Sequence, residues 1–183
     1  MKAKSDQIKR PRSTIATAKS KPLTNAQVTL LRRSFSVIET QADIAALVFY
    51  KNLFALDPSL RGLFHTSIEL QGRKLMEALE FTMATLKNPE ELVPMLEALG
   101  RRHVTYGAKH EHYGTVTQAL LQTLAATLGG KFTPSTEDAW RQALGFVCAA
   151  MQRGAREVEE LVAGKPSNVA PPGDVKASGP AHR

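Results

Sequence analysis

Residues 92–103 read Leu-Val-Pro-Met-Leu-Glu-Ala-Leu-Gly-Arg-Arg-His, and Leu92, Leu96, Leu99 and His103 lie at steps of four, three and four. Residues at these steps share one face of an α-helix, so His103 points where the leucines point. A histidine on an apolar helix face is either a hydrogen-bonded core residue or a metal ligand. Neutral imidazole in a buried apolar site suits haem iron, and the spacing alone leaves both interpretations open.

Helical spacing continues on both sides of this segment, and little strand-like alternation occurs from Leu23 to Val162. Thr24-Asn25-Ala26-Gln27 has the pattern of a capping box. The sequence therefore predicts an all-α fold with about six to eight helices. The first expected helix follows Thr24, and the last begins at Thr133-Pro134. Between them, four helices are expected at Asp43 to Leu56, about Glu69 to Leu86, about Glu91 to Tyr106 and about Glu111 to Leu128.

The positive charge of the chain is concentrated in two tails. The 183 residues carry a formal net charge of +7. Residues 1–22 hold seven basic residues against one acidic residue, and residues 163–183 hold three against one, so residues 23–162 are nearly neutral. We expect both tails to be disordered, because neither has the apolar residues to form a core. The basic tail is interpreted as a solubilising arm, with weak binding to anionic lipid or nucleic acid, or a transit peptide, as alternatives.

Other features exclude several classes of protein. No apolar run approaches the roughly 20 residues that a transmembrane helix needs. Cys148 is the single cysteine, so an intrachain disulfide and a cysteine zinc site are excluded. We expect a cytoplasmic protein, either a monomer or a homodimer.

Two polar residues also lie on apolar helix faces. Tyr50 shares a face with Leu47 and Phe54, and Gln71 lies four residues before Leu75. A hydroxyl and an amide in an apolar pocket need hydrogen-bond partners. They bond each other or a buried water, or they contact a bound diatomic ligand.

These segments together resemble the globins, most closely bacterial single-domain globins and the globin half of flavohaemoglobins, and they are also similar to neuroglobin. The resemblance covers about residues 23–160. The segments that carry it are Phe49–Ala55 with Asp57-Pro58, Leu63-Phe64, Gln71–Leu75, Leu99–His103 with Gly107–Lys109, and Phe132–Pro134 with Ala139-Trp140.

The resemblance implies a haem b cofactor and a role for each matching residue. His103 would bind the iron on the proximal side, and Tyr50 and Gln71 would meet O₂ on the distal side. Lys74 would lie near a haem propionate. The residues expected to line the rest of the haem pocket are Phe64, Leu75, Leu99, Ala108, Tyr113, Val116 and Leu144.

The sequence departs from the flavohaemoglobin pattern behind the proximal histidine. That pattern has a tyrosine ten residues after the histidine and a glutamate in the last helix. Tyr113 fills the first position, but Ala155 stands at the second. The resemblance therefore implies weak electronic push from His103 and disfavours peroxidase-like chemistry.

Three functions remain in view from the sequence. The first is tight, reversible O₂ binding, since two hydrogen-bond donors slow ligand release. The second is NO dioxygenation, which converts O₂ and NO to nitrate and would require a separate reductase, because no flavin domain is expected before the chain stops at Arg183. The third is a gas or redox sensor that acts through the basic tail. The diatomic ligands expected are O₂, NO and CO.

Overall fold

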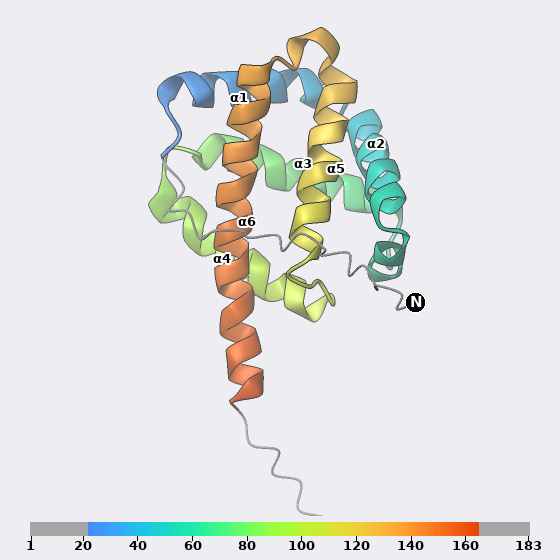
Figure 1. Ribbon diagram of the computed structural model, residues 1–183, viewed down its shortest axis with the longest axis vertical. Helices are drawn as coiled ribbons and strands as arrows, with labels where there is room; N and C mark the ends of the chain where they lie inside the picture. Colours follow the sequence, from blue (N-terminus) through green and yellow to red (C-terminus); the bar gives the residue numbers. More distant parts are fainter. Residues whose placement is uncertain (1–21, 165–183) are drawn as a thin grey trace, which may run out of the picture.

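The computed structural model describes residues 22–164, and within that range the chain forms helices and no strands (Figure 1). This confirms the all-α prediction. None of the described helices is both long enough and apolar enough to cross a membrane. Residues 1–21 and 165–183, where the two tails were predicted, lie outside the described residues. The elements are α1 (Asn25–Glu39), α2 (Ala42–Leu56), the 3-10 helix η1 (Pro58–Leu63), α3 (Ile68–Thr85), α4 (Pro89–Thr105), α5 (His112–Leu128), the 3-10 helix η2 (Gly129–Lys131) and α6 (Pro134–Ala163).

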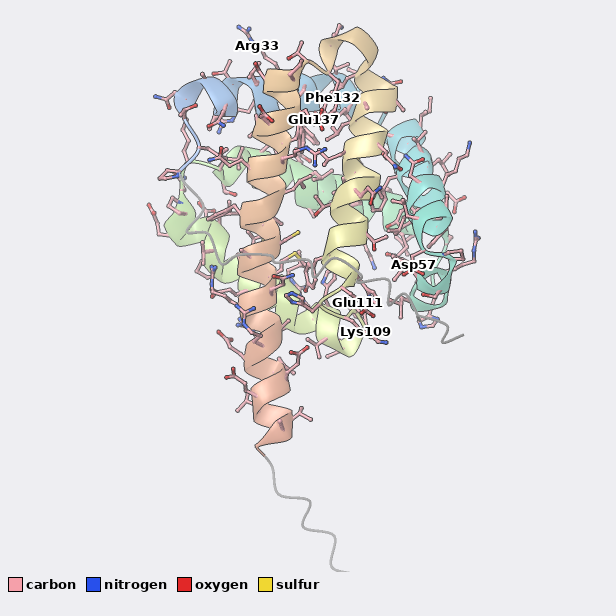
Figure 2. The ribbon with its side chains drawn as sticks, viewed as in Figure 1. Arg33, Asp57, Lys109, Glu111, Phe132 and Glu137 are labelled. Atoms are coloured by element: carbon pink, nitrogen blue, oxygen red, sulfur yellow. The ribbon has the colours of Figure 1, made fainter. Side chains whose placement is uncertain are left out.

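Side-chain caps fix where several helices begin. The Thr24 hydroxyl accepts from the backbone N–H of Gln27 at 3.2 Å, and the Gln27 side chain accepts from the Thr24 N–H at 2.9 Å, which confirms the capping box. Thr133 caps α6, with Pro134 at the first helical position. Asp57 caps η1 by accepting from the Ser59 N–H at 3.0 Å (Figure 2). Caps of this kind satisfy N–H groups that have no partner inside the helix.

Two expected boundaries were wrong. Asp43 does not cap α2; the helix begins at Ala42, and the Asp43 carboxylate lies in its first turn, where a negative charge is favourable. Pro89 does not stand outside α4, which begins at that residue. A proline is tolerated there because the first helical N–H has no partner inside the helix anyway.

The helices pack in two connected groups. In Figure 1, α5 and α6 run side by side, α1 crosses one end of them, and α4 crosses α6 nearer the other end. The contact of α4 with α6 is the most extensive between any two described helices, and α2 packs on both α3 and α5. The helix that carries His103 is therefore held mainly by α6, whereas the helix that carries Tyr50 is held by α3 and α5.

A buried hydrogen-bond chain lies where α1 meets α6. The Trp140 side chain is only 1% exposed, and its indole N–H donates to the Ser34 hydroxyl at 2.8 Å. The Ser34 hydroxyl in turn donates to the backbone carbonyl of Leu30. This chain gives the buried indole the partner that it needs, since an unpartnered donor costs about 1–3 kcal/mol.

Candidate functional site

His103 lies in the last turn of α4, with its imidazole held in one orientation. Its Nδ1 atom is 2.8 Å from the backbone carbonyl oxygen of Leu99, one turn earlier. Because a carbonyl oxygen only accepts hydrogen bonds, Nδ1 carries the proton in this contact. The other ring nitrogen, Nε2, then has a free lone pair, which is the state that a metal-binding imidazole requires.

The surroundings of His103 favour its neutral form. Burial lowers the pKa of the imidazole, and the hydrogen bond to Leu99 opposes that effect only in part. A neutral imidazole can coordinate iron without first losing a proton. His103 is half-buried, which agrees with the prediction that it lies on the apolar face of α4.

The chain turns sharply after His103. Gly107 has a φ of +81°, its N–H bonds the Val104 carbonyl, and the Ala108 N–H bonds the His103 carbonyl at 3.0 Å. This pair of bonds is a Schellman motif, in which glycine adopts the left-handed conformation at low cost. A Cβ atom at Gly107 would lie 3.3 Å from the Leu63 side chain, so the end of α4 meets the end of η1.

Tyr50 is buried in a cluster of aromatic rings. Its side chain is 5% exposed, and its ring centroid lies 5.0 Å from that of Phe49, 5.8 Å from Phe54 and 5.3 Å from Phe64. Edge contacts of this kind fix the orientation of the ring. Burial raises the pKa of Tyr50 to about 12, so its hydroxyl stays protonated and can donate a hydrogen bond at any physiological pH.

Gln71 lies on α3 but does not contact Tyr50 through its amide. The Gln71 Nε2 atom donates to the Thr66 hydroxyl at 2.6 Å, at the exposed start of the helix. The backbones of α3 and α2 approach closely here, because a Cβ on Gly72 would lie 2.7 Å from the Cβ of Ala46. The helix is thus placed beside Tyr50, while the Gln71 amide is engaged elsewhere.

The other predicted pocket residues fall into three groups. Phe64, Leu75, Val116 and Leu144 pack in the core cluster that contains Tyr50, whereas Leu99 and Tyr113 belong to the cluster that joins α4, α5 and α6. Ala108 is half-buried in the turn before α5, and Lys74 is exposed on α3. Thr66, which holds Gln71, was not predicted from the sequence, because it precedes the helix and no helical spacing links it to that glutamine.

Tyr113 presents a buried hydroxyl without a partner. Among the described residues, the Tyr113 hydroxyl is the buried side-chain polar atom that makes no hydrogen bond. Its pKa is raised mainly by burial, with smaller contributions from the charges of Cys148 and Glu159. Ala155, at the position where the flavohaemoglobin pattern has a carboxylate, is buried on α6 and offers no acceptor. A buried hydroxyl of this kind points to a group that the described residues do not supply.

Two hollows within residues 22–164 are lined by residues other than His103, Tyr50 and Gln71. A surface hollow of about 210 Å³ lies between α1, the start of α2 and α3, and none of the predicted site residues lines it. An apolar cavity of about 20 Å³ lies between α2, α3, α5 and α6, and Leu75 is the predicted site residue in its wall. The candidate site is therefore defined by the side chains of His103, Tyr50 and Tyr113 rather than by either hollow.

Comparison with known proteins identifies the family. The model of the family Globin matches residues 47–151, which include part of α2, all of α3, α4 and α5, and the first part of α6. The chain belongs to the globin family. This globin is 28% identical over 147 residues to a flavohemoprotein of Deinococcus radiodurans, an alignment that covers 79% of this chain and 36% of that protein. A flavohemoprotein of Vibrio cholerae is 26% identical over 128 residues, which cover 68% of this chain and 32% of its own. The globin thus spans about a third of the length of these curated relatives.

Two solved structures share its fold. One is a hexacoordinated heme protein from an anhydrobiotic tardigrade, with a TM-score of 0.68, 20% identity and coverage of 74% of this globin and 96% of that chain. The other is an engineered carbene transferase derived from a candidate nitric oxide dioxygenase of Rhodothermus marinus, with a TM-score of 0.70, 24% identity and coverage of 77% and 99%. At these identities, the likeness establishes the fold.

Family membership and the flavohemoprotein relatives imply a haem cofactor. The residues present fit such a group at His103. Its half-buried ring has a free Nε2 atom, and burial lowers the pKa of the imidazole. The assignment of His103 as the iron ligand, and of Tyr50 and Gln71 as contacts for a diatomic ligand, stays a prediction.

Proposed function

We propose that this globin holds haem b through His103 and binds O₂ reversibly and tightly. The observation that carries the proposal is the 2.8 Å contact between Nδ1 of His103 and the Leu99 carbonyl, which leaves Nε2 as the free nitrogen of a neutral ring. When bound, the haem supplies an iron atom that takes up a diatomic gas. The polypeptide orients the proximal imidazole, excludes water and offers hydrogen bonds on the distal side.

Tyr50 is the main distal donor in this proposal. Its ring is fixed by three aromatic neighbours, and its pKa of about 12 keeps the hydroxyl proton in place. A diatomic ligand with partial negative charge would be held by a donor aimed at it, so the Tyr50 hydroxyl would slow the release of O₂. A hydrogen bond contributes about 0.5–1.5 kcal/mol net, and somewhat more in a dry pocket.

The contribution of Gln71 to ligand binding depends on whether its amide leaves Thr66. To donate to a bound gas, its amide must leave the Thr66 hydroxyl, which it contacts at 2.6 Å. Part of its contribution is therefore offset by the lost contact, and we assign the larger share of O₂ retention to Tyr50. Glutamine also lacks an imidazole, so Gln71 would not ligate the iron and His103 would be the protein ligand. Lys74 is exposed on α3, where its ammonium is available to a haem propionate.

Absorption spectra of the haem-reconstituted protein test this function. Ferric, ferrous, ferrous–CO and ferrous–O₂ forms should be recorded from one preparation. We expect a five-coordinate ferrous spectrum and an O₂ complex that persists for minutes or longer. A six-coordinate ferrous spectrum, or an O₂ complex lost at once when free O₂ is removed, would contradict the proposal.

NO dioxygenation is the second candidate, favoured by the flavohemoprotein relatives. This reaction would turn O₂ and NO into nitrate, and each cycle would take one electron from the haem that a separate reductase would have to return. The Tyr50 side of the pocket would serve both functions, so the difference lies in the electron supply. NO consumption that continues for many turnovers with an added flavin reductase would favour the enzyme, whereas a single turnover per haem would favour the binding protein.

The location, partner and oligomeric state of the protein are further parts of this proposal. We propose a cytoplasmic location, and a separate reductase as the partner if the protein acts as an enzyme. We propose a monomer or a homodimer. Deleting residues 1–22 while following O₂ release and binding to anionic vesicles or nucleic acid tests the sensor alternative, which would be wrong if both stayed unchanged.

A further inference from the structure

The helix that carries His103 makes backbone contact with α6 at a pair of glycines. A Cβ atom added to Gly100 on α4 would overlap the Met151 carbonyl oxygen on α6. A Cβ added to Gly154 on α6 would in turn overlap the Glu97 carbonyl oxygen on α4. Each helix thus places a glycine against a carbonyl of the other, which is an approach that a residue with a Cβ atom does not permit.

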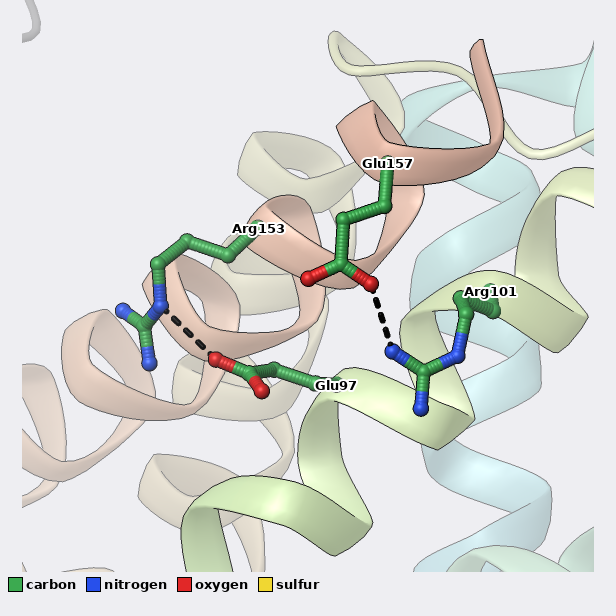
Figure 3. Close-up of polar contacts among 4 residues, drawn as sticks. All are labelled: Glu97, Arg101, Arg153 and Glu157. Carbon is green, nitrogen blue, oxygen red and sulfur yellow. Dashed lines mark hydrogen bonds and ion pairs between the residues drawn. The ribbon is translucent and has the colours of Figure 1, made fainter. Parts of the chain in front are cut away.

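Two ion pairs flank this crossing (Figure 3). Nε of Arg153, next to Gly154, lies 2.9 Å from a carboxylate oxygen of Glu97. Nη1 of Arg101, next to Gly100, lies 2.7 Å from a carboxylate oxygen of Glu157. One pair has its arginine on α6 and the other on α4, so sliding either helix along the other would break both pairs.

These ion pairs contribute little to overall stability. The side chains of Arg101 and Glu157 are 41% and 54% exposed, and those of Arg153 and Glu97 are 44% and 24% exposed. Exposed pairs contribute at most about 1 kcal/mol each, because water screens them and ordering long side chains costs entropy. Their more specific effect is on register, since they fix which turn of α4 faces which turn of α6.

The crossing lies one turn before His103. Gly100 follows Leu99, whose carbonyl orients the imidazole, and His103 comes three residues after Gly100. A helix moves nearly as a rigid body over one turn, so displacing α4 at Gly100 displaces both the Leu99 carbonyl and the imidazole. The packing of α4 on α6 can therefore act on the position of the ring through the backbone of α4.

We propose that Gly100 and Gly154, with the ion pairs Glu97–Arg153 and Arg101–Glu157, are positioning residues that fix the placement of His103 relative to the haem. The proposal rests on His103 as the iron ligand. Under it, the strength of the iron–imidazole bond depends on how closely α4 approaches α6. Neither glycine nor either ion pair touches the bound gas.

The variant Gly154→Ala tests the proposal, with Gly145→Ala as its matched control on the same helix. A Cβ on Gly145 meets nothing within 4 Å, so that change alters helix propensity alone. The readout is the iron–imidazole stretching band in the resonance Raman spectrum of the ferrous protein. We expect Gly154→Ala to shift the band and Gly145→Ala to leave it in place. An unmoved band in a folded Gly154→Ala protein would overturn the proposal.

A second set of variants decides the question if Gly154→Ala fails to fold. Arg153→Glu places two carboxylates together across the crossing, and the double variant Glu97→Arg with Arg153→Glu restores an ion pair of opposite orientation. We expect the band to shift in the single variant and to return in the double variant. A band that stays in place in the single variant, or that follows thermal stability rather than charge pairing, would overturn the proposal.

The wild-type spectrum separates this proposal from the proposed function. If the wild-type protein lacks an iron–imidazole band, or if His103→Gly retains it, the ligand assignment fails and the positioning role fails with it. If the band is present, depends on His103 and is insensitive to the crossing, the positioning role alone is wrong.

Discussion

Replacing Tyr50 with phenylalanine removes one hydroxyl and keeps the ring that packs on Phe49, Phe54 and Phe64. If this hydroxyl donates to bound O₂, its loss removes about 0.5–1.5 kcal/mol of stabilisation from the complex. At 1.4 kcal/mol per factor of ten, O₂ dissociation should become about two- to twelve-fold faster. The free energy of unfolding should change by less than about 1.5 kcal/mol, because the volume of the ring is conserved.

The assay is stopped-flow mixing of the O₂ complex with excess CO and dithionite, which measures the O₂ dissociation rate directly. Tyr106→Phe serves as a comparison in which the lost hydroxyl belongs to the proximal side, because Tyr106 is 58% exposed at the end of α4 and its ring centroid lies 5.9 Å from that of His103. The CO dissociation rate serves as a second control, since bound CO carries less negative charge and gains less from a donor. The selective acceleration of O₂ release is therefore the signature of the hydroxyl.

The reasoning would be refuted if Tyr50→Phe released O₂ at the wild-type rate, or if it accelerated O₂ and CO release equally. The pH dependence offers a related check. Burial raises the pKa of Tyr50 to about 12, so the hydroxyl keeps its proton throughout the range from pH 7 to 10. The O₂ dissociation rate should be flat over that range. A tyrosine with the ordinary pKa of about 10 would be half ionised at pH 10 and would release O₂ faster there.

Two further predictions concern the fold that holds the site. Ser34→Ala leaves the buried Trp140 indole N–H without its acceptor and should lower the free energy of unfolding by about 1–3 kcal/mol in urea titrations, whereas Ser36→Ala on the exposed side of α1 should change it by less than about 0.5 kcal/mol. Gly72→Ala should cost about 1–3 kcal/mol by crowding Ala46, and the swap Gly72→Ala with Ala46→Gly should recover part of that loss. Equal stability of the two serine variants, or no recovery in the swap, would show that these contacts are misjudged.

Much of the fold follows from local features of the sequence. The capping box at Thr24 and the Thr133-Pro134 start of α6 were predicted because such signals act within one turn of the chain. Asp43 and Pro89 were misplaced by one or two residues, since an acidic residue or a proline is favourable both at the cap and in the first turn that follows. Ambiguities of this size are inherent in local signals.

Residues of the candidate site could be proposed from the sequence only where regular spacing places their side chains on one face of a helix. The placement of His103 on the apolar face of α4 could be predicted because it continues a stripe of leucines, whereas its role as an iron ligand stays a prediction. The hydrogen bond from its ring to Leu99 is seen only in the structure. The hydrogen bond from the Gln71 amide to the Thr66 hydroxyl could not be predicted, because it depends on the side-chain rotamers of both residues. The contacts of Gly100 with Met151 and of Gly154 with Glu97 join residues 51 and 57 positions apart and follow from the packing of two whole helices. No pattern within one helix encodes such a contact.

The central claim is that Nε2 of His103 is the nitrogen that binds haem iron. The most direct test is the ferrous absorption spectrum of His103→Gly, recorded without and with added imidazole, beside His110→Gly as a control histidine on the exposed turn before α5. We predict that His103→Gly loses the five-coordinate imidazole spectrum, that imidazole restores it, and that His110→Gly resembles the wild-type protein. A wild-type spectrum in His103→Gly without added imidazole would contradict the claim.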